Sequence, residues 1–189
     1  MQPALESNPP MPNSTGVTPA AREPRWFWPL VLSAAFALRL GAVAFLVGLE
    51  TPPKPGSDEQ EYDIYAWNVA QGRGYRGPSV DVSDQDHLTA YRPPTTPLVY
   101  AGLYWLFGHR YTPLYIFNAL LGAATIWLVY DIALRSFDRR AARWAAVLYA
   151  FYPLTIFYTL SINSEIHACF LVCLLVGFAL RVQGPRGVV

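Results

Sequence analysis

The sequence predicts an all-α polytopic membrane protein with about four transmembrane helices and a long outer loop that carries interfacial helices. Hydrophobic residues make up 53% of the chain and charged residues 14%, whereas soluble domains carry about 25% charged residues. Aromatic residues reach 15%, which is typical of proteins that sit at membrane interfaces. The net charge of +1 gives no reason to expect a nucleic acid partner.

The first predicted span follows a polar tail. Residues 1–25 are rich in Pro, Ser and Asn, which predicts a disordered cytoplasmic tail. Segment 26–49 is apolar apart from Ser33 and Arg39, and its length of about 36 Å is enough to cross a hydrocarbon core of about 30 Å. It is too long and starts too late for a cleaved signal peptide. Arg39 lies deep in this span and needs a partner, for which Asp131 is a candidate.

Three more apolar segments predict further spans. The second span is 114–134, and the third is 139–159, which is bent or ended near Pro153. The fourth span is 165–182, where a basic residue and a Gly-Pro pair follow. Residues 183–189 are then a cytoplasmic end, and we expect the chain to be truncated there.

Basic residues predict the orientation of these spans. Arginines lie before the first span, between the second and third, and after the fourth. If each span crosses the membrane once, all of these arginines lie on the same side of the membrane. By the positive-inside rule this side is the cytoplasm, which predicts a multi-pass protein of the bacterial inner membrane with a cytoplasmic N-terminus. Residues 50–113 then form the outer loop. The arginines concerned are Arg22, Arg25, Arg135, Arg139, Arg140, Arg143, Arg181 and Arg186.

The outer loop contains a predicted helix at 58–71. Ser57 and Gln60 have the spacing of a capping box, which indicates a helix start. Asp58 falls in the first turn, where the helix dipole favours an ionised carboxylate that can accept a proton. Alternatively, Asp58 and Glu59 are ordinary first-turn acids. One face of the helix is expected to lie on the membrane surface, and it consists of Tyr62, Tyr65, Ala66 and Val69.

A second predicted helix, 95–108, follows the run Tyr91-Arg92-Pro93-Pro94. Arg92 is expected to stand above the membrane beside the start of this helix, which is a good place to hold a phosphate. Alternatively, Arg92 is an interfacial arginine that snorkels to water. Glu165, at the outer end of the fourth span, is either a functional acid or a helix cap.

The order of the motifs adds a family resemblance. The chain resembles the N-terminal part of the membrane glycosyltransferases of C type (GT-C). It is most similar to the family 39-like group of bacterial protein-mannosyltransferases and aminoarabinose transferases. The motifs are Ser57-Asp58-Glu59 with Tyr62, Gly72-Arg73-Gly74-Tyr75, Ala90-Tyr91-Arg92-Pro93-Pro94, Asn118-Ala119-Leu120-Leu121-Gly122, Tyr152-Pro153 and Ser164-Glu165.

This resemblance implies a function. Such enzymes transfer a hexosyl or pentosyl group from a polyprenyl-phosphate carrier to a lipid, protein or glycan acceptor on the outer face of the membrane. Asp58 matches the catalytic carboxylate of the family, which acts as general base on the acceptor hydroxyl. Arg92 matches the basic residue that holds the carrier phosphate. The candidate accessory residues are Glu59, Tyr62, Asp84, Asp86 and Glu165.

Two departures from the family pattern leave alternatives open. Tyr91 stands where some relatives carry a second acid, and Asp84 or Asp86 are candidates to replace it, so a divalent metal is an open question. Family members also have many more spans. The alternative to an enzyme is therefore a non-catalytic four-span binding or assembly subunit, or a truncated and inactive gene product. In either case membrane lipids are expected partners.

Overall fold

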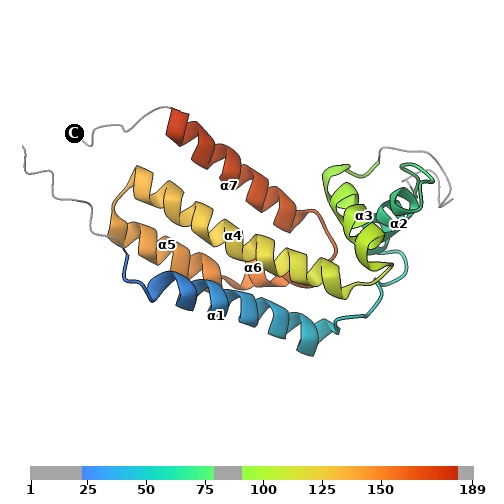
Figure 1. Ribbon diagram of the computed structural model, residues 1–189, viewed down its shortest axis with the longest axis horizontal. Helices are drawn as coiled ribbons and strands as arrows, with labels where there is room; N and C mark the ends of the chain where they lie inside the picture. The colour runs from blue at the N-terminus through green and yellow to red at the C-terminus, as the bar shows by residue number, and fades with distance from the viewer. Residues whose placement is uncertain (1–22, 79–90, 183–189) are drawn as a thin grey trace, which may run out of the picture.

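The computed structural model describes residues 23–78 and 91–182, and every regular element within these ranges is a helix (Figure 1). The tail 1–22, the end 183–189, and the candidates Asp84 and Asp86 lie outside the described residues. The prediction of an all-α membrane protein is confirmed.

The helices form a bundle with a helix pair at one end. Figure 1 shows α1 (Phe27–Ala42), α4 (Thr112–Ser136), α5 (Arg139–Phe151) and α7 (Glu165–Val182) running along the length of the bundle. The pair α2 (Asp58–Ala70) and α3 (Thr95–Phe107) pack against each other beyond the end where α4 begins. Cavities lie at the two ends of this arrangement.

Three helices in the described part of the chain are long and apolar enough to cross a membrane: Phe27–Val47, Thr112–Ser136 and Glu165–Val182. The first of them ends in a π-helical turn, Val43–Val47, and Gly48 stops it with a φ of 94°. The third predicted span, 139–159, is different because it is not one helix.

The break in that segment is at Pro153, as the sequence predicts. α5 ends at Phe151, and α6 (Pro153–Phe157) and a 3₁₀ turn (Tyr158–Leu160) continue along the bundle. Proline has no N–H to donate to the preceding turn, so carbonyl groups at the end of α5 lose their helical partners. The hydroxyl of Thr155 lies 2.9 Å from the carbonyl oxygen of Tyr152 and donates to it.

Arg39 supplies donors at the same break. Its guanidinium is fully buried, and Nη1 donates to the carbonyl oxygen of Ala150 at 3.0 Å, while Nη2 donates to Thr155 Oγ1 at 3.3 Å. The expectation that Asp131 is its partner is wrong. Asp131 instead accepts from Arg135 at 2.9 Å and from Arg181 at 3.1 Å. The broken helix offers free acceptors next to Arg39. Asp131 instead lies near the C-terminal ends of α4 and α7, where Arg135 and Arg181 bind it.

Small residues let these helices approach. Ala35 of α1 and Ala142, Ala146 and Ala150 of α5 are fully buried in one cluster. On α4, Gly122 faces Arg39, and a Cβ there would lie 2.9 Å from Arg39 Nε. The absence of a side chain at Gly122 is therefore what makes room for the guanidinium.

The face of α2 predicted to lie on the membrane surface packs inside the protein instead. Tyr62 and Ala66 are buried in one cluster with Tyr100 and Tyr104 of α3. The two helices are equally long, and α3 has an apolar face of its own, so the pair can bury both faces against each other. This packing fixes the orientation of α2 relative to α3.

Candidate active site

The start of α2 places Asp58. Ser57 is the N-cap, and its Oγ accepts from the backbone N–H of Gln60 at 3.3 Å. The Gln60 side chain reaches back and accepts from the N–H of Gly56 at 2.7 Å. The helix start predicted from Ser57 and Gln60 is thus confirmed, and the reciprocal bonds hold the first turn in place. The side chain of Asp58 is 67% exposed at this turn.

Arg92 bridges two carboxylates of α2. Its Nη2 donates to Asp58, and its Nε donates to Glu61 Oε2 at 2.6 Å. Asp58 and Glu61 are three residues apart and therefore share a face of the helix. The structure thus brings together Asp58 and Arg92, which sequence analysis singled out separately. It also adds Glu61, which sequence analysis missed although its spacing from Asp58 was a usable signal.

Aromatic rings surround the Arg92 guanidinium, which is 17% exposed. Its Cζ lies 5.4 Å from the ring centre of Tyr62 and 5.0 Å from that of Tyr91, both within cation–π range. Burial by itself lowers the pKa of Arg92, but the hydrogen bonds that Arg92 donates to Glu61 and Asp58 outweigh it and raise the pKa above the ordinary value. The group is a permanent cation beside Asp58.

The Gly72-Arg73-Gly74-Tyr75 motif holds the backbone of Arg92. Gly72 and Gly74 have φ values of 73° and 84°, which side chains rarely tolerate, and they turn the chain back after α2. Tyr75 then stacks on Tyr65 of α2 at 4.6 Å between ring centres, and its hydroxyl donates to the carbonyl oxygen of Arg92 at 2.8 Å. The motif therefore positions the arginine rather than the carboxylate.

A cavity of about 640 Å³ opens beside Asp58, and we call it the Asp58 groove. It lies between the π-helical turn Val43–Val47, the start of α2 and the segment that begins at the end of α6. Its lining contains both polar and apolar side chains. The polar ones include Lys54, Asp58, Glu59 and Asn163, and the apolar ones are Leu46, Val47, Phe157 and Leu160.

Two further carboxylates lie near this groove. Burial raises the pKa of Glu59, the charge of Glu165 adds to that effect, and Lys54 opposes it. Buried oxygen atoms of Ser161, Asn163 and Glu165 have no hydrogen-bond partner among the described residues. Such atoms normally find a partner in water or in a ligand. Lys54 and Asn163 are groove residues that sequence analysis did not single out.

No group of three or more His, Cys, Asp or Glu side chains that could hold a metal ion occurs within residues 23–78 and 91–182. Asp84 and Asp86, the candidates for replacing the second acid, are outside these ranges.

Comparison with known families decides the class. A family model described as dolichyl-phosphate-mannose-protein mannosyltransferase matches residues 91–184, about half of the chain. The chain is a mannosyltransferase-like GT-C protein. Neither the curated proteins nor the solved structures give a match.

The family match covers only part of the candidate site of this GT-C protein. It includes Arg92, the break at Pro153 and Glu165. It begins after Asp58 and Glu59, so the α2 side of the site rests on the geometry and on the motif order. The family match supports a membrane glycosyltransferase in general terms.

Proposed function

We propose that this protein transfers a sugar from a polyprenyl-phosphate carrier to a lipid, protein or glycan acceptor at the outer face of the membrane. The observation that carries the proposal is the meeting of Asp58 and Arg92, 34 residues apart in the chain, at an amphipathic groove. Transfer from a lipid-linked sugar donor requires a base, a cation that binds the phosphate and an apolar surface for the hydrocarbon chain. Asp58 supplies the base, Arg92 the cation and the groove the apolar surface.

The groove suits the donor in both of its parts. Leu46, Val47 and Phe157 offer an apolar surface to the polyprenyl chain. Lys54 lines the same groove and adds a second cation to that of Arg92. The carrier phosphate can bind the guanidinium group, whose Nη2 donates to Asp58 and whose Nε donates to Glu61 in the present structure.

The chemistry then depends on Arg92 changing partners. When the carrier phosphate takes Nη2 of Arg92, Asp58 is released, while Glu61 keeps its bond to Nε. Asp58 accepts the proton of the acceptor hydroxyl as the acceptor oxygen attacks the anomeric carbon. The bond between that carbon and the phosphate oxygen breaks, and Arg92 stabilises the negative charge left on the carrier phosphate.

The experiment measures donor binding and sugar transfer separately, with the purified chain in lipid nanodiscs and polyprenyl-phosphate mannose as the donor. Asp58→Asn should lower transfer by about 100-fold or more and leave donor binding within about threefold. Arg92→Gln should weaken donor binding as well. Glu50→Gln is a matched control, because Glu50 is an acid at the same end that pairs with Arg110 and does not line the groove.

Unchanged transfer by Asp58→Asn would refute the assignment of the base. Donor binding by the unaltered chain without any transfer would instead favour the binding-subunit alternative.

A further inference from the structure

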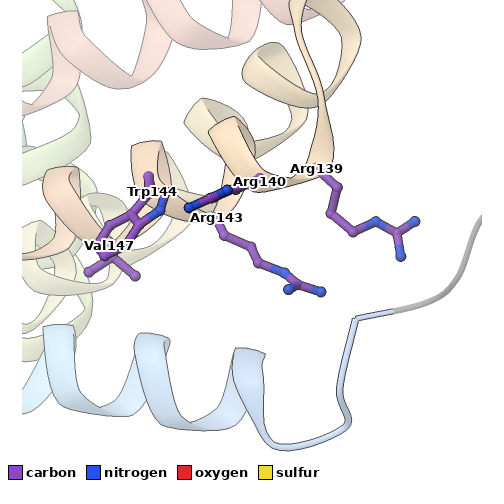
Figure 2. A pocket seen from close by; sticks show the side chains of 5 residues that line it. All are labelled: Arg139, Arg140, Arg143, Trp144 and Val147. Atoms are coloured by element: carbon purple, nitrogen blue, oxygen red, sulfur yellow. The ribbon is translucent and has the colours of Figure 1, made fainter.

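A second cavity lies at the opposite end of the bundle from α2 and α3. It has a volume of about 570 Å³ and is lined by α5, and we call it the arginine pocket. Its side chains are Arg139, Arg140, Arg143, Trp144 and Val147, and Figure 2 shows them projecting from the N-terminal part of the helix.

The arginine pocket has an excess of positive charge. Arg143 Nε lies 2.7 Å and Arg139 Nε 3.6 Å from the carboxylate of Glu23, so these two cations share one acid. Arg140 is exposed and contacts no carboxylate among the described residues. Arg139 and Arg143 share the carboxylate of Glu23, and the pocket therefore carries an excess of positive charge that favours an anion.

The apolar side chains of the pocket lie further along the same helix. Trp144 is one turn beyond Arg140, and Val147 is one turn beyond Arg143, so two of the three arginines lie one turn before an apolar residue. The Trp144 side chain is 59% exposed. The order of cation, indole and aliphatic group from the bundle end inward matches the order of phosphate, glycerol and acyl chain in a phospholipid.

We propose that the arginine pocket binds the headgroup of an anionic phospholipid from the leaflet at this end of the bundle. Arg140 and Arg143 bind the phosphate, and Trp144 and Val147 contact the glycerol and the first methylene groups. A guanidinium fork suits a phosphate better than an ammonium does. The apolar side chains of Trp144 and Val147 favour a lipid over free phosphate, because free phosphate has no apolar group to contact them. The site is at the other end from the Asp58 groove and does not depend on the proposed sugar transfer.

The test is native mass spectrometry of the detergent-purified full chain, titrated with phosphatidylglycerol or with phosphatidylcholine. Phosphatidylglycerol should bind at least about tenfold more tightly, because each arginine near a membrane surface contributes roughly 1 kcal/mol to anionic lipid binding. Arg140→Gln should weaken its binding about fivefold. Arg110→Gln removes the same charge at the α2–α3 end and should change binding less than about twofold.

Two further arms separate the lipid from free phosphate and from misfolding. Trp144→Ala should weaken phosphatidylglycerol binding, and a large excess of inorganic phosphate should not displace the lipid. Arg140 is exposed, so Arg140→Gln should unfold at the same SDS concentration as the unaltered chain. Equal binding of the two lipids, equal losses in Arg140→Gln and Arg110→Gln, or full displacement by inorganic phosphate would each overturn the proposal.

Discussion

The bundle and the α2–α3 end bury polar groups in different ways. In the bundle, several buried polar side chains donate to backbone carbonyl groups, as Arg39 does to Ala150 and as Thr159 does to Thr155, at 3.0 Å in each case. At the α2–α3 end, side chains bind one another across long stretches of sequence. The Asp58–Arg92 pair is one example, and the surroundings of Asp63 are another.

Asp63 ties α2 to the chain around the end of α3. Its Oδ1 accepts from the hydroxyl of Tyr104 at 2.5 Å and lies 2.8 Å from His109 Nε2, and its Oδ2 accepts from the hydroxyl of Tyr111 at 3.2 Å. Burial and the charge of Asp63 raise the pKa of Tyr104 above its ordinary value, so the phenol stays a donor. His109 is stacked on Trp67 of α2, with ring centres 4.5 Å apart.

The difference shows what each region needs. An apolar bundle has no water to satisfy the carbonyl groups freed by a broken helix, so a side chain must do it. The α2–α3 pair has no long apolar span to hold it, and its cross-links decide where the site residues stand. Damage to the bundle should therefore reduce overall stability, whereas damage to the Asp63 cluster should disturb the position of α2.

Arg39→Ala should have the largest effect on stability. It leaves the carbonyl of Ala150 without this donor and creates a cavity, so we expect a loss of about 3 kcal/mol in the free energy of unfolding. SDS-induced unfolding of the purified chain measures this. In a Pro153→Ala background the helix can continue and the N–H of Leu154 can reach the carbonyl of Ala150, so the same substitution should cost about 1 kcal/mol less. Strictly additive losses would show that Arg39 does not act through the break.

Asp63→Asn should cost about 2 kcal/mol, because asparagine offers one acceptor oxygen and places an amide donor against another donor. Limited proteolysis should show faster cleavage around α2, with α4 and α7 still protected. Tyr104→Phe removes one donor and should cost about 1 kcal/mol. If both variants resist proteolysis like the unaltered chain, the Asp63 cluster does not hold α2 in place.

Glu59 should give the smallest effect, and it depends on pH. Its pKa is raised by burial and by Glu165, so the folded state favours protonated Glu59. This contribution is fully present below the unfolded value of about 4.5 and is lost as the pH rises through the folded value. Glu59→Gln stays neutral, so its stability should decline less than that of the unaltered chain as the pH rises from 4 to 7. Parallel stability curves would contradict the raised pKa.

Local features of this protein follow from the sequence alone. The long apolar stretches, the cap at Ser57 and the break at Pro153 depend on residues close together in the chain, so composition and spacing were enough to predict them. The family resemblance also rested on motif order, and the matching family model confirms it over residues 91–184.

The tertiary structure decided which polar groups meet. Arg39 binds the carbonyl of Ala150 at the break rather than Asp131, and the aromatic face of α2 packs on α3. Glu61 shares Arg92 with Asp58, which no local pattern required. A buried donor binds whichever acceptor the packing brings within about 3 Å. That choice is made among residues far apart in the chain, so it appears only when the helices are packed.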